Sequence, residues 1–303
     1  MAATADLSAP GELSDREREA VEALLYRLAD DEFVIADRYT DWQVHAPTIE
    51  SDIAIANIAQ DELGHARLWY DLLEDFGYTE SDLIWERDPD TFRHSTLCEL
   101  PFADGDWADA IVRSYLYDEA EHLRLGALEG SSYPRIRNRI GKVTSEEDYH
   151  REHAENWLRR LAGGDEGRER VQDAVDRLFP YALALFEPSV ARSATDTSSG
   201  QSPRDAGEVE DDIDDLGLRT RTLEDMRTEW IETVTDTLTA IGIDVERPHV
   251  EDGRVAAEDL PEHVGRDGDH TEHWRTQFDE ITNTYRELER HDATRLMEDP
   301  DDE

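Results

Sequence analysis

Apolar residues recur every three or four positions along most of the chain, and this period is typical of amphipathic helices. Four long stretches show it most clearly, so we expect helices over about residues 15–42, 48–76, 106–128 and 134–161. No segment shows sustained alternation of period two, which a half-buried strand would require. The sequence therefore predicts an all-α protein whose body is a four-helix bundle.

Local signals mark where these helices begin and end. The run Ser14-Asp15-Arg16-Glu17 is a capping box, and Pro47-Thr48 restarts the chain before the second helix. Gly77 follows the second helix and Gly163-Gly164 follows the fourth, as glycine commonly does after a helix.

Helical signals continue beyond the bundle. A fifth helix is expected over about residues 166–186, with a kink at Pro180, and two more over about 222–241 and 269–290. Residues 189–215 contain many Ser, Asp, Glu and Gly but few large apolar residues, which is typical of a flexible linker or surface loop.

These elements divide the chain into three expected parts. Residues 1–188 form the helical bundle, residues 189–221 an acidic flexible linker or loop, and residues 222–303 a C-terminal helical extension that packs on the bundle. The last six residues, 298–303, are acidic and are expected to fray.

The acidic composition changes the expected surface. Charged residues make up 35% of the chain and the formal net charge is −44, which would favour disorder if the apolar periodicity were absent. Of 31 basic residues only Lys142 is a lysine. Such a surface is typical of proteins from halophiles, because at about 1 M salt the Debye length is only about 3 Å. An acidic protein from an organism of ordinary salinity is the alternative.

Several classes of site and location are disfavoured. Nucleic acid is not expected as a partner, because phosphate contacts need clustered positive charge. The single cysteine, Cys98, excludes an intrachain disulfide and a cysteine-ligated cluster. No apolar run approaches the length of a membrane span, and the N-terminus lacks the features of a signal peptide. We therefore expect a cytoplasmic protein that does not bind membranes.

Two Glu-x-x-His pairs stand on predicted helices of the bundle, Glu62 with His65 and Glu147 with His150. Residues three apart share a helix face, so each pair can present a carboxylate and an imidazole to one point. Di-iron bundles use such a pair from each of two helices and one carboxylate from each of the other two. The pattern alone is weak evidence in so acidic a chain, which contains two further pairs: Glu119/His122 and Glu246/His249.

The apolar faces of the four helices are each interrupted at mid-length by acidic or histidine residues. Buried carboxylates without partners are costly, and a metal ion is one of the few partners that offsets several at once. Iron suits a mixture of carboxylate oxygen and imidazole nitrogen, and manganese is the alternative. The candidate metal ligands are two pairs and two single acids: Glu32, Glu62, His65, Asp118, Glu147 and His150.

Simpler explanations stay open for each residue taken singly. A single acid on an apolar face is more often a solvated edge residue or an ion-pair partner, and a single helical histidine is more often a hydrogen-bonded core residue. Glu119 competes with Asp118 for the place on the third helix. His122 and His153 are expected to be outer partners of the site or surface residues. The fourth pair contains a proline and is expected to be accidental.

Segments on three of the helices resemble the A- and C-type subunits of the phenylacetyl-CoA epoxidase family. They are Ile58-Ala-Gln-Asp-Glu-Leu-Gly-His65, Trp107-Ala-Asp109 with Tyr115-Leu-Tyr-Asp118, and Glu146-Glu-Asp-Tyr-His150. The resemblance implies a ferritin-like bundle that holds two iron ions. It also implies that the six candidate positions match the iron ligands of the catalytic A-type subunit, which favours Asp118 over Glu119.

The C-terminal half resembles the C-type subunit more specifically. The run Gly265-Arg-Asp-Gly-Asp-His-Thr-Glu-His273 is similar to the ending of that subunit, as is Leu178-Phe-Pro-Tyr181 followed by Leu185-Phe-Glu187. Bacterial C-type subunits have lost several metal ligands and act as structural partners of the catalytic subunit. This chain departs from that pattern because it keeps the full set, which puts a purely structural role in doubt.

The resemblance implies a subunit of a multicomponent oxygenase that converts phenylacetyl-CoA to its ring 1,2-epoxide, with electrons from a separate reductase. The implied partners are the catalytic A-type subunit and the reductase, in a hetero-oligomer, with a homodimer also open. Glu62 and Glu147 would bridge the two irons, with Glu32 and Asp118 as terminal carboxylates. The alternatives are a non-catalytic assembly subunit and a ferritin relative that stores iron or removes peroxide.

Overall fold

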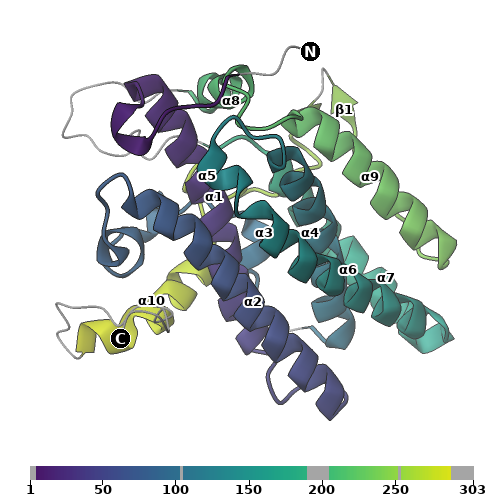
Figure 1. The fold of residues 1–303 in the computed structure, drawn as a ribbon. Helices are drawn as coiled ribbons and strands as arrows, with labels where there is room; N and C mark the ends of the chain where they lie inside the picture. Colours follow the sequence, from purple (N-terminus) through teal and green to yellow (C-terminus); the bar gives the residue numbers. More distant parts are fainter. Residues whose placement is uncertain (1–4, 103–104, 190–204, 252–253, 288–303) are drawn as a thin grey trace.

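Four long helices form the body of the computed structural model, which describes residues 5–102, 105–189, 205–251 and 254–287 (Figure 1). Helix α1 packs along α2, and α4 packs along α6, so two helical hairpins face each other. The all-α, ferritin-like prediction is confirmed. The four helices of the bundle are α1 (Asp15–Thr40), α2 (Ile49–Glu74), α4 (Trp107–Leu128) and α6 (Ile140–Ala162).

Side-chain caps fix the starts of three of these helices. The capping box predicted before α1 is present: the Ser14 hydroxyl accepts from the Glu17 N–H, and the Glu17 carboxylate accepts from the Ser14 N–H at 2.8 Å. Thr48 caps α2 by accepting from the Ser51 N–H at 3.2 Å. Asp106 caps α4, where the Ala108 N–H donates to its carboxylate at 2.7 Å. Each cap satisfies N–H groups that have no partner inside the helix.

The fourth predicted helix is interrupted. Residues Pro134–Arg137 form a separate short helix, α5, before α6 begins at Ile140. The Arg139 N–H donates to the Ile136 carbonyl three residues back, at 2.9 Å, so the turn between them is tighter than an α-helix. Helix α7 (Asp165–Leu183) contains Pro180 near its end and passes into the 3₁₀ turn η4 (Ala184–Phe186).

Short elements cover the bundle between its main helices. They are the 3₁₀ turns η1 (Pro10–Glu12) and η3 (Pro89–Thr91), the π-helical turn η2 (Ser81–Trp85), helix α3 (Thr96–Glu99), and the antiparallel pair β1 (Val250–Glu251) and β2 (Arg254–Val255). Helix α3 packs against α1 and brings a loop from the middle of the chain to the bundle.

The expected linker is partly helical. Helix α8 (Ala206–Asp215) packs on α1, with Val209 and Ile213 buried and an Arg16–Asp212 ion pair of 2.5 Å. The prediction of a linker or loop is therefore wrong for residues 206–215, which form a helix. Residues 190–204 and the acidic tail, 298–303, lie outside the described residues.

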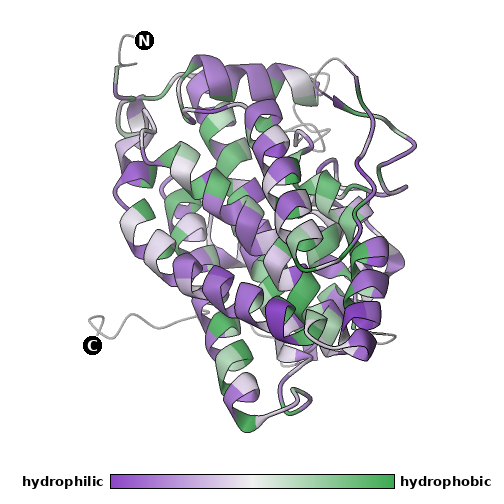
Figure 2. Cartoon of the chain, turned by 90° about the vertical axis from the view of Figure 1, so that its right-hand side faces the viewer, coloured by the Kyte–Doolittle hydropathy of each residue, from purple (hydrophilic) through white to green (hydrophobic). Residues whose placement is uncertain are grey.

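The C-terminal segment packs on the bundle through two helices, α9 (Leu223–Ala240) and α10 (Glu272–Glu287). The indole N–H of Trp230 on α9 donates to the Leu116 carbonyl of α4 at 3.0 Å. One continuous apolar core joins these helices to the bundle, and Figure 2 shows hydrophilic residues along much of the outside. None of the described helices is both long and apolar enough to cross a bilayer.

Candidate metal centre

The six residues predicted as metal ligands are all buried at the centre of the bundle, with exposures of 0–1%. Each of the four main helices supplies at least one of them. Four of the six come closest together, with one ligand atom each inside a group whose atoms all lie within 4.8 Å of one another: Glu32, Glu62, His65 and Glu147.

The two imidazoles face the same pair of carboxylates. His65 Nδ1 lies 3.3 Å from Glu147 Oε1 and 3.9 Å from Glu62 Oε2. His150 Nδ1 lies 3.2 Å from Glu147 Oε1 and 3.6 Å from Glu62 Oε1. The ring centroids are 6.3 Å apart. Glu62 and Glu147 therefore lie between the two histidines, and Glu32 lies on the His65 side, 3.9 Å from its Nδ1.

Helix α4 contributes Asp118, which accepts from the Ser114 hydroxyl at 3.0 Å through one carboxylate oxygen. Its other oxygen is buried and makes no hydrogen bond among the described residues. Glu119, the alternative on this helix, binds Arg151 through two hydrogen bonds of 3.2 Å. His122 is 40% exposed and lies near Asp148. The structure thus directs Asp118, and neither Glu119 nor His122, toward the bundle centre.

Two outer carboxylates that the sequence interpretation missed hold the histidine rings. His65 Nε2 pairs with Glu146 at 2.8 Å, and His150 Nε2 pairs with Asp61 at 3.3 Å. Each acid immediately precedes the glutamate of a Glu-x-x-His pair, yet it serves the histidine of the other helix. Metal-binding histidines typically donate their second ring nitrogen to such a group, which fixes the ring and leaves Nδ1 free for the metal.

Unpaired polar atoms converge inside this ring of residues. No carboxylate oxygen of Glu32, Glu62 or Glu147 accepts a hydrogen bond among the described residues, and neither histidine Nδ1 is hydrogen-bonded. Buried polar atoms without partners cost free energy, so a group of them at one point indicates an absent ligand. Carboxylate oxygens and imidazole nitrogens are donors that a divalent cation such as iron accepts.

The close approach of several buried carboxylates shifts the pKa values of residues in the site. Burial, and then the negative charge of Glu62, raises the pKa of Glu32 well above its usual range. Burial disfavours a charge on His65, but the adjoining carboxylates of Glu147 and Glu62 outweigh it and raise the pKa of His65 to about 10. Bound cations would relieve the repulsion and displace these protons.

Glu32 differs from its neighbours on α1 in how its charge is balanced. Asp30 binds Arg87 through two hydrogen bonds of 2.7 and 2.8 Å. Asp31 binds Arg266 at 2.9 and 2.8 Å, and also Arg124. Burial opposes ionisation of Asp31, but these arginines hold its pKa well below the usual range. No arginine of the described residues pairs with Glu32, so its charge is left for a metal ion or a proton.

Glu121 is a further buried acid that the sequence interpretation missed. It lies on α4, almost one turn beyond Asp118, and forms an ion pair with Arg124, which also binds Asp31. Its spacing from Asp118 was the available signal, because residues three apart on a helix share a face.

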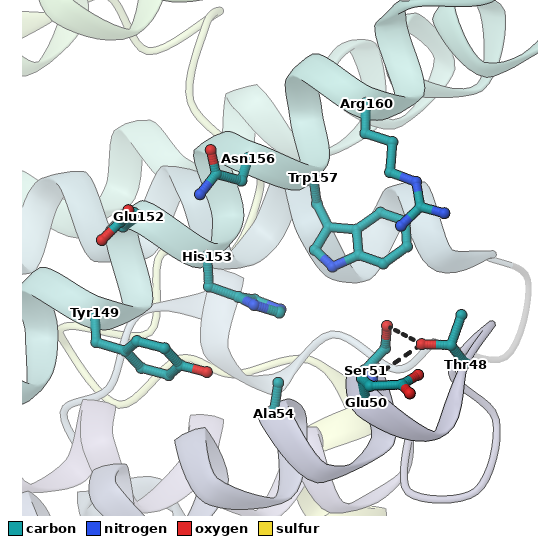
Figure 3. A pocket seen from close by; sticks show the side chains of 10 residues that line it. All are labelled: Thr48, Glu50, Ser51, Ala54, Tyr149, Glu152, His153, Asn156, Trp157 and Arg160. Carbon is teal, nitrogen blue, oxygen red and sulfur yellow. Dashed lines mark hydrogen bonds between the residues drawn. The ribbon is translucent and has the colours of Figure 1, made fainter.

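A cavity of about 740 Å³ lies between the first turns of α2 and the facing side of α6. Figure 3 shows Tyr149, His153 and Trp157 of α6 directed toward Ser51 and Ala54 of α2. Tyr149 also contacts the ring of His150, with centroids 6.2 Å apart. The cavity therefore has aromatic walls, and one of its wall residues, Tyr149, touches a candidate ligand.

A second histidine–carboxylate group lies outside the bundle centre, at the C-terminal segment. His94 Nε2 and His270 Nδ1 both contact Glu99 Oε2, at 2.6 and 2.9 Å. The Thr271 N–H donates to the other Glu99 oxygen at 2.8 Å, and His270 Nε2 contacts the Phe92 carbonyl. Because both oxygens of the Glu99 carboxylate have hydrogen-bond partners, this group needs no metal ion to compensate its buried charge.

The chain is similar to known proteins over most of its length. A model of the phenylacetic acid catabolic protein family matches residues 4–292. The C subunit of 1,2-phenylacetyl-CoA epoxidase from Escherichia coli (strain K12) is 32% identical over 168 residues, covering 54% of this chain and 67% of that relative. The A subunit of the same enzyme is 28% identical over 150 residues, covering 49% of this chain and 48% of that relative. The chain thus aligns with about two thirds of one relative and half of the other.

Proposed function

The chain belongs to the phenylacetic acid catabolic protein family, and from this premise we propose that it is a subunit of a phenylacetyl-CoA ring 1,2-epoxidase with its own di-iron site. The observation that carries the proposal is the group of unpaired carboxylate and imidazole atoms at the centre of the bundle. Residues at this point cost stability in the absence of a cation, and a protein with a purely structural role has no need of them.

The residues divide into two sets around the proposed irons. Glu62 and Glu147 lie between the histidines and are suited to bridge both ions. Glu32 and His65 would complete one coordination sphere. The other would be completed by Asp118 and His150. Iron bound here would supply the activation of oxygen that ring epoxidation requires, and manganese is the alternative ion.

The surrounding residues prepare the site. Glu146 and Asp61 hold the two rings with Nδ1 inward, so the nitrogen ligands are oriented before a metal arrives. The cavity between α2 and α6 offers Tyr149, which touches His150, and Trp157 to a flat aromatic group, and this suits the phenyl ring of the proposed substrate. The chain is proposed to act with an A-type subunit and a reductase in a hetero-oligomer.

A non-catalytic assembly subunit is the second candidate. What favours it is the similarity to the C subunit of the Escherichia coli enzyme, whose identity and coverage exceed those of the A subunit. In that role the chain would support the active subunit and its own metal site would be vestigial.

Metal content tests the proposal directly. Protein purified in molar salt with iron present is expected to contain about two irons per chain, measured by elemental analysis. The double variant Glu62→Ala, Glu147→Ala should contain none, because both bridging carboxylates are gone. The variant Glu119→Ala, His122→Ala is the matched control: it removes a Glu-x-x-His pair outside the site and should keep its iron.

Absence of metal from the unmodified chain would overturn the di-iron proposal and leave the assembly role. If iron is present, phenylacetyl-CoA turnover with a reductase separates the two roles. An epoxidase subunit with its own site loses activity in the double variant even when an unmodified A-type subunit is supplied. With a non-catalytic assembly subunit, the double variant keeps its activity.

A further inference from the structure

Residues 263–278 form a segment, here called the C-terminal strap, that crosses the bundle beside helix α1. It contains the run from Gly265 to His273 whose chemistry the proposed function leaves unused. His270 and the Thr271 N–H bind Glu99, and the Trp274 indole donates to the Pro89 carbonyl at 3.0 Å. The strap is therefore attached at several points to the loop between α2 and α4.

Two glycines let the strap approach the loop closely. Gly265 has φ +83°, and a Cβ placed there would lie 2.2 Å from the His94 carbonyl oxygen. Gly268 has φ +89°, and its Cβ would lie 2.0 Å from the Asp90 carbonyl oxygen. Only glycine fits both the left-handed conformation and the space. The turn between them carries Arg266 into the protein interior, where it is completely buried.

The Arg266 guanidinium makes its hydrogen bonds through its two terminal nitrogens. Its two terminal nitrogens donate to the two carboxylate oxygens of Asp31, at 2.9 and 2.8 Å. They also donate to the carbonyls of Arg93 and Leu185, at 2.8 and 3.1 Å. A planar fork of this kind fixes the orientation of a carboxylate as well as its charge.

The strap holds α1 at further points beyond Glu32. The Gln277 amide donates to the Val34 carbonyl at 3.1 Å and to the Asp37 carboxylate at 2.8 Å. Arg38 donates to the His273 carbonyl at 3.3 Å. Together with Asp31, these contacts follow α1 for about two turns, starting at the residue next to a candidate metal ligand.

We propose that Arg266 is a positioning residue of the metal centre: by clamping Asp31, it fixes the part of α1 from which Glu32 reaches the metal. The inference rests on the proposed metal site. It assigns the C-terminal strap a role in metal binding although none of its described residues belongs to the ligand group.

Electrostatics and positioning predict opposite effects of removing Arg266 on the affinity for a cation. Removing the positive Arg266 makes the surroundings of Glu32 more negative, and by electrostatics alone a cation should then bind more tightly. Loss of positioning instead lets Glu32 move from the ligand geometry, so binding weakens. The sign of the change in affinity therefore distinguishes the two.

Titration of the metal-free full chain with Co²⁺ alone, followed by the visible absorption of the bound ion, measures this sign. We expect both Arg266→Gln and Arg266→Lys to bind Co²⁺ at least tenfold more weakly, with an altered spectrum. Lysine keeps the charge but cannot make the bidentate contact. Arg275→Gln is the matched control, because this strap arginine is 57% exposed and pairs with Asp90 at the surface, and it should bind Co²⁺ within twofold of the unmodified chain.

Circular dichroism of each metal-free variant checks the fold. If Arg266→Gln does not fold, Arg266→Lys and the charge-balanced variant Arg266→Gln, Asp31→Asn carry the test. Unchanged or tighter Co²⁺ binding by the folded Arg266 variants would overturn the positioning role while leaving the metal site intact. Failure of the unmodified chain to bind Co²⁺ would overturn the metal site itself, and this inference with it.

Discussion

At the scale of single residues, two buried clusters of histidine and carboxylate differ in their hydrogen bonding. At Glu99 both carboxylate oxygens have partners, since His94 and His270 contact one oxygen and the Thr271 N–H donates to the other. His94 is stacked on His270, with centroids 4.0 Å apart. At the metal centre the acceptors exceed the donors, and Glu62 and Glu147 keep unpaired oxygens. The first cluster is satisfied by hydrogen bonds within the fold, whereas the second leaves unpaired oxygens at the proposed metal site.

His94 gives the fold a dependence on acid. Burial, and then the positive charge of His270, lowers the pKa of His94 to about 4 from its usual value near 6.5. The unfolded chain therefore binds a proton at higher pH than the folded one. The stability that this histidine contributes is complete above pH 6.5 and is lost as the pH falls through 4, by about 3 kcal/mol in total.

The variant His94→Gln isolates this effect, because glutamine can still donate to Glu99 but does not titrate. Free energies of unfolding in urea, measured from pH 7 to pH 4, should fall more steeply for the unmodified chain than for the variant. Titratable groups that do not contact His94 are common to both proteins and cancel in the comparison. Parallel profiles would show that His94 does not cause the dependence.

The sequence allowed prediction of those residues of the candidate metal centre that share a face with the apolar residues of their own helix. The six candidates were found because each interrupts an apolar stripe, and the structure buries all six. Asp61 and Glu146 were missed because each serves the opposite helix, which no spacing within one helix reveals. The role of Arg266 was missed as well, since its partner Asp31 lies 235 positions away.

At the scale of elements, the long helices were predictable from sequence, whereas short segments held by tertiary contacts were not. Periodicity is local, so three of the main helices were located to within two residues, while the fourth begins six residues later than predicted, after the separate helix α5. Helix α8 was missed because it is short and acidic and has only Val209 and Ile213 as buried apolar residues. It is held by contacts with α1, and sequence propensity carries no information about those.

Two glycine substitutions test how far backbone fit determines these elements. Gly265→Ala should destabilise the chain by at least about 2 kcal/mol, because it combines left-handed strain with a clash against the His94 carbonyl. Gly126→Ala is the matched control. That glycine is exposed inside α4, its Cβ would meet open space, and alanine should stabilise the helix by about 0.5–1 kcal/mol. Urea unfolding measures both, and equal effects would contradict the close approach of the strap.

At the scale of the whole molecule, charged residues of both signs are buried. Nine arginines are buried among the described residues: Arg27, Arg38, Arg87, Arg93, Arg113, Arg124, Arg219, Arg227 and Arg266. Eleven acidic residues of the described part are buried as well, so buried charges nearly cancel and the net charge of −44 lies almost entirely at the surface. Repulsion between surface carboxylates opposes the compact state, and salt screens that repulsion.

Stability should accordingly rise with salt. Between 0.1 and 2 M KCl we expect Tm to increase by roughly 5–15 °C, measured by circular dichroism on metal-free protein. Sucrose of equal osmolality is the control, since it strengthens burial without screening charge. A Tm that responds equally to both solutes would show that surface repulsion is not the cause. A halophilic source stays a prediction from composition.

Because Glu146 of α6 contacts His65 of α2, and Asp61 of α2 contacts His150 of α6, the proposed metal site would need both helices before it could bind metal. During synthesis the α1–α2 hairpin emerges first, with Glu32, Glu62 and His65, while Glu146 and Glu147 are still to come. This first hairpin can form its helices but cannot orient His65 or close the site. With the proposed ligand set, tight metal binding would have to wait until the second hairpin docks, so metal uptake during refolding would report the docking of the two hairpins and not the formation of either one.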